Sequence, residues 1–201
     1  MIRVRPACSD DLAALTQIVA EAFNVKMHVL FGRNPARVQR MLGGIYTGPL
    51  SYGYDGLLLA ELNRDPVGVI AIEPMPWGSD DAARLDLLVR TELSAWRQWW
   101  NRIGFSVFSH GPEEGDAYLS DVSVLKRARG RGVGMALVRN AETWAVAHRR
   151  RAITLWVASN NRTARSLYER AGLVATKHEV NWLSGLLFGI PRWTYMCKQL
   201  N

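Results

Sequence analysis

The sequence predicts an α/β fold in which one sheet is flanked by helices. Strand-like and helix-like segments alternate along the chain, which is typical of layered α/β domains. A glycine-rich turn joins a strand to a helix within residues 117–147, and no apolar run approaches the ~20 residues that span a bilayer. We expect a single domain over residues 1–201, since this length suits one sizeable core.

Composition limits the classes of function. The net charge is +7, but the positive charge comes almost entirely from Arg, which indicates a habit of the whole chain rather than a nucleic-acid surface. Two cysteines at opposite ends and scattered histidines predict neither a disulfide framework nor a metal site. With no apolar leader at the N-terminus, we expect a cytoplasmic protein that does not enter membranes.

The first half of the chain alternates between short strands and helices. The pattern predicts a strand at Ile2–Arg5, a helix capped by Ser9 or Asp10 and running through Phe23, and a short helix that Pro35 starts and Gly43-Gly44 ends. It then predicts a hairpin of two strands, Leu57–Leu62 and Pro66–Glu73, joined by a turn at Asn63–Asp65.

A helix is predicted at Asp81–Arg102, where apolar residues recur at three- and four-residue steps. Its tryptophans, Trp96 and Trp100, have two interpretations. They pack this helix onto the core, or they belong to a segment that walls an acceptor pocket or forms a dimer contact.

The central stretch opens as a strand, Ala117–Val124. Strict alternation would put Tyr118, Val122 and Val124 on one face and Leu119, Asp121 and Ser123 on the other. The turn Arg129-Gly130-Arg131-Gly132-Val133-Gly134 follows, and a helix continues to Ala147. A helix that begins on glycines directs free N–H groups and its positive dipole end outward, which suits a phosphate.

The remaining segments are shorter. We expect a strand at Ala152–Val157, a helix at Thr163–Ala171 capped by Asn160 or Asn161 and stopped by Gly172, and strands at Val174–Val180 and Arg192–Leu200. The connection between the last two, Trp182–Pro191, is unusually apolar. Exposing it to water would be costly, so it covers an acceptor site, the 81–102 helix or a second subunit.

Two stretches resemble the GNAT superfamily of N-acetyltransferases. The turn Arg129-Gly130-Arg131-Gly132-Val133-Gly134 is similar to the family's motif A, although Lys126 stands where the family often has Pro. Residues 161–173, Asn161-Arg-Thr-Ala-Arg-Ser-Leu-Tyr168-Glu-Arg-Ala-Gly-Leu173, resemble motif B. The resemblance implies a central mixed, mostly antiparallel sheet, with residues 77–116 as a helical insertion between the third and fourth core strands.

The resemblance implies acetyl-CoA as the co-substrate. The residues expected to bind it surround the gap beside the central strand and the start of the following helix. They are Val122, Ser123, Val124, Arg129, Gly130, Arg131, Gly132, Val133, Gly134, Met135 and Asn161. The basic cluster at 126–131 would lie beside the coenzyme's phosphates.

Tyr168 matches the family's tyrosine that donates a proton to the departing thiolate, and a purely structural aromatic is the alternative. Asp121 is the candidate base that neutralises the attacking amine. Its rivals are Glu73, Glu113, Glu114, Asp116, His110 and a chain of waters.

The leading hypothesis is therefore an acetyl-CoA-dependent N-acetyltransferase acting on a primary amine of a small molecule, peptide or protein. The alternative is a non-catalytic CoA-binding or nucleic-acid-associated module on the same fold, because a fold does not determine a function. A homodimer is one use for the apolar segments described above.

Overall fold

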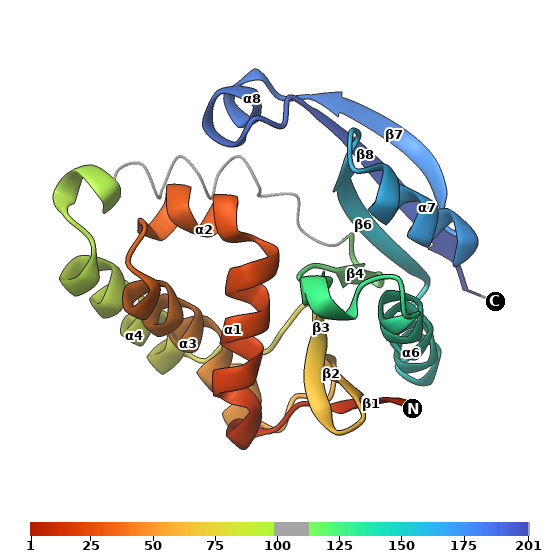
Figure 1. Ribbon diagram of the computed structural model, residues 1–201, viewed down its shortest axis with the longest axis horizontal. Coiled ribbons are helices and arrows are strands. Elements are labelled where there is room, and N and C mark those ends of the chain that lie inside the picture. Colours follow the sequence, from red (N-terminus) through yellow and green to blue (C-terminus); the bar gives the residue numbers. More distant parts are fainter. Residues whose placement is uncertain (99–112, 201) are drawn as a thin grey trace.

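The computed structural model describes residues 1–98 and 113–200 (Figure 1). The first elements are β1 (Ile2–Pro6), a 3₁₀ turn (Ser9–Asp11), α1 (Leu12–Ala22), α2 (Asn24–Phe31), α3 (Pro35–Ser51), β2 (Leu57–Leu62), β3 (Asp65–Glu73) and α4 (Ser79–Glu92). The later elements are β4 (Ala117–Leu119), β5 (Ser123–Val124), a 3₁₀ turn (Lys126–Ala128), α6 (Val133–Ala147), β6 (Ala152–Ala158), α7 (Arg162–Arg170), β7 (Val174–Val180), α8 (Trp182–Phe188) and β8 (Arg192–Gln199).

One sheet organises these elements in the order β1-β2-β3-β4-β6-β8-β7, with β5 also paired to β3. Among the strands of the described residues, every pairing is antiparallel except the parallel pairing of β4 with β6. Helix α6 covers one face of β1–β3, α1 covers the other, and α3 and α4 form a further layer outside α1 (Figure 1). The predicted α/β class, with a mostly antiparallel sheet and a helical insertion between the third and fourth strands, is confirmed.

The β2–β3 hairpin forms as predicted, with a tighter turn. Asn63 and Arg64 both have positive φ, 54° and 70°, which is the backbone that a two-residue hairpin turn requires. Asp65 belongs to β3, where it pairs with Leu62. Strands β2 and β3 are buried on both faces along Leu57–Ala60 and Val67–Ile72 and form the centre of the core.

The N-terminal capping differs from the prediction. The side chain that caps the 3₁₀ turn before α1 is Asp11, which accepts from the Cys8 amide at 2.8 Å. Both Asp11 oxygens also accept from the Arg5 guanidinium, at 2.6 and 2.8 Å. The hydrogen bond from Arg5 lowers the pKa of Asp11 to about 2. The ion pair with Arg5 of β1 therefore explains why Asp11, and not Ser9 or Asp10, is the capping side chain.

Helix α3 contradicts the predicted stop at Gly43-Gly44, because it continues to Ser51. Its glycines allow α4 to approach closely. A Cβ at Gly44 would lie 2.5 Å from Leu88 Cδ1, and a Cβ at Gly48 would lie 2.5 Å from the Asp81 carboxylate. Close packing of two helices thus outweighs the weak helix propensity of glycine.

Helix α4 ends at Glu92 rather than at Arg102. Leu93 adopts an extended backbone (φ −112°, ψ 135°) and is 3% exposed, so a side chain enters the core where the helix would have continued. The Gln98 amide caps the end by donating to the Leu93 carbonyl at 2.9 Å. Arg40 of α3 holds Glu92 through two bonds of 2.6 and 2.9 Å. The predicted helix beyond residue 98 lies outside the described residues.

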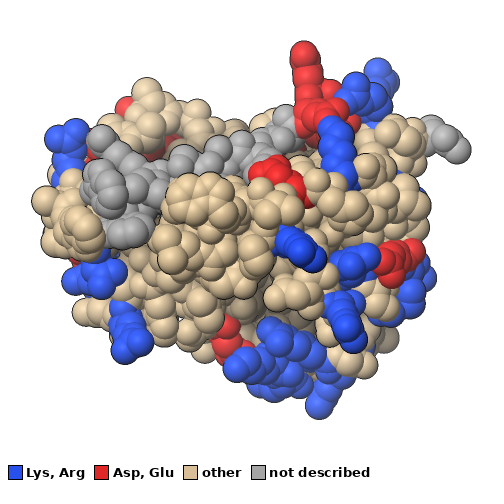
Figure 2. Space-filling model, turned by 90° about the horizontal axis from the view of Figure 1, so that it is seen from above, with Lys and Arg blue, Asp and Glu red and all other residues tan. Residues whose placement is uncertain are grey.

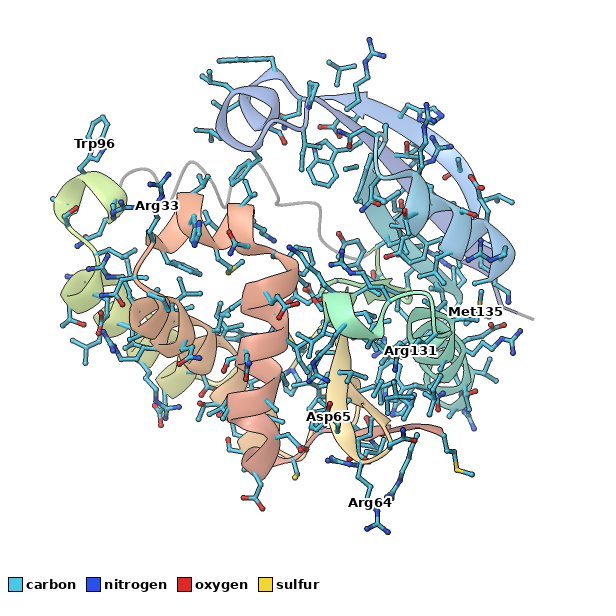
Figure 3. The ribbon with its side chains drawn as sticks, viewed as in Figure 1. Arg33, Arg64, Asp65, Trp96, Arg131 and Met135 are labelled. Atoms are coloured by element: carbon cyan, nitrogen blue, oxygen red, sulfur yellow. The ribbon has the colours of Figure 1, made fainter. Side chains whose placement is uncertain are left out.

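The core-packing interpretation of Trp96 is wrong, since its side chain is 65% exposed and points away from the body of the molecule (Figure 3). Trp100 lies outside the described residues. None of the helices described in residues 1–98 and 113–200 has both the length and the apolar character to cross a bilayer.

The predicted central strand Ala117–Val124 is interrupted. Leu119 lies opposite Ile72 and Ser123 lies opposite Val69, so the stretch from Leu119 to Ser123 contains one residue more than the facing stretch of β3. Such a bulge reverses the alternation beyond it. Tyr118 and Val124 therefore lie on opposite faces, contrary to the expectation that they share one.

Candidate active site

The strands around the predicted coenzyme gap diverge as they leave the bulge. β4 pairs with β6 at Ala117 and Tyr118, whereas β5 pairs with β3 and β6 continues beside β8 to Ala158. Val122 and Val124 are half-buried at this divergence, and Ser123 is 1% exposed. Ser123 lies opposite Val69 and its side chain is buried, so the backbone of Ser123, and not its side chain, is suited to face the gap.

The glycine-rich turn leads directly into α6. Gly130 and Gly132 have φ of 72° and 84°, and Gly132 is the N-cap of the helix. The bond from the Ala136 amide to the Gly132 carbonyl (3.0 Å) is the first of the helix. The amides of Val133, Gly134 and Met135 precede it, so helix geometry gives them no intrahelical acceptor. Arg131 and Met135 mark this end of α6 in Figure 3.

The space around the glycines separates two roles. A Cβ at Gly130 would meet nothing within 4 Å, and one at Gly132 would meet only Ile2 Cδ1 at 3.7 Å. A Cβ at Gly134 would instead lie 3.1 Å from Leu167 Cδ2 of α7. Gly130 and Gly132 thus leave an open, amide-lined cradle that fits a pyrophosphate, while Gly134 lets α6 and α7 pack together.

Part of the basic cluster before the helix is already engaged. Arg127 pairs with Asp65 of the hairpin, and Arg129 Nε donates to the Val124 carbonyl at 3.1 Å. Arg129 therefore ties the turn to β5, and Arg131 is exposed at the cradle. The sequence suggested a phosphate role for the whole cluster, but Arg127 is committed to the hairpin.

Helix α7 places the other motif residues. Asn161 caps it, its Oδ1 accepting from the Ala164 amide at 3.1 Å, which decides between the two candidate caps. Tyr168 is 6% exposed on the inner side of the helix. Burial, and secondarily the neighbouring Tyr118, raises the pKa of Tyr168 far above its usual value, so the hydroxyl keeps its proton.

Asp121 lies in the bulge and faces α3, where its carboxylate accepts a hydrogen bond from Tyr46. Tyr46 is fully buried, and burial raises its pKa well above its usual value. Glu73 is half-buried at the end of β3, directly opposite Tyr118 of β4. Burial raises the pKa of Glu73, the Ser120 hydroxyl lowers it, and the charge of Asp121 raises it further.

The other candidate bases have different surroundings. Asp116 is 3% exposed and pairs with Arg151 at 3.0 Å, and Glu113 lies 3.3 Å from Lys177 and 3.6 Å from Arg151. Glu114 is exposed, and His110 lies outside the described residues. Among these rivals Glu73 is the carboxyl group that shares a neighbourhood with Asp121.

Sequence reasoning missed Tyr46 as the partner of Asp121, since nothing in residues 24–52 indicated which helix would reach the bulge. Tyr118 was placed on a strand without a chemical role. The strand that ends at Glu73 pairs with the central strand. An expected pairing of these two strands could have suggested that Tyr118 lies beside Glu73, because cross-strand neighbours share a face.

The apolar connection Trp182–Pro191 folds as helix α8, capped by Asn181 and ended by Gly189 at φ 70°. It lies beside α2, a neighbour that the sequence did not suggest. Phe188 is 8% exposed, whereas Trp182 and Leu186, one turn apart, are 76% and 73% exposed. One side of α8 is therefore core and the other is open.

The described residues contain no group of three or more His, Cys, Asp and Glu side chains arranged to hold a metal ion.

Comparison with known proteins gives a consistent result. Residues 28–173 match the model of the acetyltransferase (GNAT) family. A crystal structure of an acetyltransferase superposes with a TM-score of 0.66 at 19% identity, covering 99% of this chain and 100% of that one. Ribosomal-protein-alanine N-acetyltransferase from Brucella melitensis gives a TM-score of 0.63 at 16% identity, with coverages of 98% and 99%.

A third structure, yncA from Salmonella typhimurium, was solved with its cofactor acetyl-CoA. It gives a TM-score of 0.62 at 16% identity and covers 100% of this chain and 94% of that one. At these identities the likenesses establish the fold. No curated protein matches the chain.

Proposed function

Because the chain belongs to the acetyltransferase (GNAT) family, whose acetyl donor is acetyl-CoA, we propose that it transfers an acetyl group directly to a primary amine. The acceptor is a small molecule or an exposed amine of a peptide or protein. The observation that carries this proposal is the open cradle at Gly130 and Gly132, which follows the diverging strands and leads into α6, the helix that packs on α7 with its buried Tyr168.

The chain's own residues divide the work of binding the coenzyme. Amides from Gly130 to Met135, with Arg131 beside them, bind the pyrophosphate at the positive end of α6. Backbone groups of residues 122–124, held by Arg129, and the side chain of Asn161 bind the pantetheine arm. An amide in the same bulge polarises the thioester carbonyl.

Two proton transfers accompany the transfer of the acetyl group. An alkyl ammonium with a pKa of about 10 costs on the order of 4 kcal/mol to deprotonate at pH 7, so a nearby base is useful. Asp121 and Glu73 lie on the acceptor side of the bulge. Tyr168 keeps its proton and donates a hydrogen bond, and then the proton, to the departing sulfur.

The direct test is thiol release from acetyl-CoA with a panel of small amines and peptides. We expect turnover with at least one primary amine and none with the corresponding alcohol. Coenzyme binding without turnover across the panel would favour the non-catalytic module instead. On the face seen in Figure 2 the basic side chains form separate groups interrupted by acidic and uncharged residues, so this face offers nucleic acid no continuous basic surface.

Gly130→Val is expected to weaken acetyl-CoA binding on the order of tenfold or more, because a side chain would occupy the space where the phosphate and main chain meet. Gly53→Val is the matched control. Gly53 also has positive φ (65°) and open space around it, but it lies outside the cradle. Calorimetry showing the same coenzyme affinity for both variants would contradict the pyrophosphate role.

We further propose that α8 lines the acceptor side. Trp182→Ala and Leu186→Ala remove exposed surface, so they should leave the melting temperature nearly unchanged and raise the acceptor KM about fivefold or more. The acetyl-CoA KM should stay the same. Phe188→Ala, which truncates a buried side chain, is the structural control and should lower stability by roughly 3–5 kcal/mol. If the exposed variants change only oligomeric state, α8 is a subunit contact.

A further inference from the structure

Two carboxylates meet at the bulge, Glu73 from the end of β3 and Asp121 from between β4 and β5. They are close enough for the charge of Asp121 to act on Glu73. Glu73, Tyr118 and Asp121 are each only partly buried, so part of each residue is accessible to solvent. A base for the acceptor amine needs such a position, near the coenzyme gap yet open to the acceptor.

The two carboxylates have different partners. Asp121 accepts from Tyr46, a fully buried hydroxyl whose raised pKa keeps it a donor. That bond fixes Asp121 against α3 and occupies one of its oxygens. Glu73 has the hydroxyl of Ser120 as its neighbour and lies opposite Tyr118 in the sheet. Asp121 is thus anchored in the scaffold, whereas Glu73 is the carboxylate directed along the face that carries Tyr118.

Several neighbouring elements contribute charged and titratable groups to the surroundings of Glu73. Asp121 raises its pKa, and the Lys26 ammonium of α2 lowers it. The charge of Glu73 also contributes to raised pKa values at three tyrosines, Tyr46, Tyr54 and Tyr118, and their hydroxyls therefore stay protonated. Burial outweighs the other influences, and the net effect is a carboxylate that binds protons more readily than an exposed one.

Tyr118 connects this carboxylate to the proposed donor. It lies opposite Glu73 in the sheet, and it is the neighbour whose presence raises the pKa of Tyr168. Glu73 and Tyr168 are therefore both neighbours of the same tyrosine. An amine placed beside Tyr118 would have both the base and the departing sulfur's donor in its neighbourhood.

Resting on the proposed function, we infer that Glu73 accepts the proton of the acceptor ammonium, and that Asp121 is a positioning residue that keeps Glu73 in this role. Glu73 takes one proton from the ammonium, and the neutral nitrogen forms the N–C bond as the C–S bond breaks. The sulfur receives a proton from Tyr168. The acetylated nitrogen then loses its extra proton, which reprotonates the Tyr168 phenolate. Glu73 later releases its own proton to solvent.

Glu73→Gln is the first test, since it keeps the shape and removes the base. We expect kcat/KM at pH 7 to fall roughly 10²-fold, with acetyl-CoA affinity unchanged by calorimetry. The acidic limb of the pH profile of kcat/KM, which in the wild type reports protonation of Glu73, should disappear.

Two further variants, Asp121→Asn and Lys26→Met, should shift the acidic limb of the kcat/KM profile in opposite directions. Removing the Asp121 charge lowers the pKa of Glu73, so the loss of activity on acidification should move to lower pH. Removing the Lys26 charge raises that pKa, so the limb should move to higher pH. Merely structural roles for these residues would lower activity at all pH values without moving the limb in opposite directions.

A second readout does not depend on turnover. In protein labelled with ¹³C at the Glu carboxyl, the Glu73 resonance should titrate above the exposed glutamates, and it should titrate lower in Asp121→Asn. If the wild type is active and Glu73→Gln keeps full activity, the inference is overturned and the proposed function stands. The same holds if Asp121→Asn abolishes the acidic limb and Glu73→Gln retains it. A wild type that releases no thiol with any amine would overturn the proposed function as well.

Discussion

Tyr168→Phe is expected to lower kcat roughly 10²-fold or more while the Kd for acetyl-CoA stays unchanged. The hydroxyl is buried near the diverging strands, and its raised pKa keeps it protonated, so it can donate whenever negative charge develops on the sulfur. A group that acts only as the sulfur departs contributes to the transition state and not to coenzyme binding. Steady-state kinetics together with calorimetry separates these quantities.

The control for this variant is Tyr52→Phe. Its hydroxyl donates to Asp81 at 2.8 Å in the α3–α4 layer, away from the diverging strands. Loss of that bond should lower the melting temperature slightly, with kcat intact. If Tyr168→Phe behaves in the same way, with a small loss of stability and wild-type turnover, the hydroxyl of Tyr168 has only a packing role.

Gly48→Ala is expected to reduce the free energy of unfolding by about 2–4 kcal/mol and the melting temperature by roughly 5–15 °C. The added Cβ would lie 2.5 Å from three atoms of the Asp81 carboxylate, which is 2% exposed. Asp81 has no freedom to yield, because it accepts from the Gly78 amide at 2.9 Å and from Tyr52 at 2.8 Å. Moving it would leave a buried charge without its donors.

Gly43→Ala is the matched control, five residues earlier in the same helix. A Cβ there meets nothing within 4 Å. Since alanine is the better helix former, we expect this variant to gain about 0.5–1 kcal/mol. Thermal unfolding of both variants by circular dichroism tests the pair, and equal effects would show that helix propensity, not contact with α4, decides the outcome.

Local patterns identified much of the fold. The hairpin, the turn from Arg129 to Gly134, the helix capped by Asn161 and the final strand pair all appear where the sequence placed them. Each depends on residues within a few positions of one another, such as a side chain that caps its own helix. The same locality made motif residues such as Gly130 and Tyr168 recognisable before any fold was known.

Errors arose wherever a distant partner overruled the local signal. Gly43-Gly44 reads as a stop until α4 packs on α3, and Asp81–Arg102 reads as one helix until Leu93 turns into the core. The alternation of residues 117–124 continues in the sequence, while pairing with β3 forces a bulge. Trp96 has the spacing of a core residue but lies on the surface.

The sequence by itself indicated most element types and the family, and it predicted the residues of the coenzyme cradle, because turns, caps and helix starts are properties of short segments. Only the tertiary structure decided which carboxylates meet at the bulge. Glu73, Asp121 and Tyr46 come from three separate stretches of the chain, and they meet because the β3 register, the bulge and the packing of α3 bring them together. The same long-range packing sets the proton affinity of Glu73, since burial and a neighbouring charge exist only after the chain has folded.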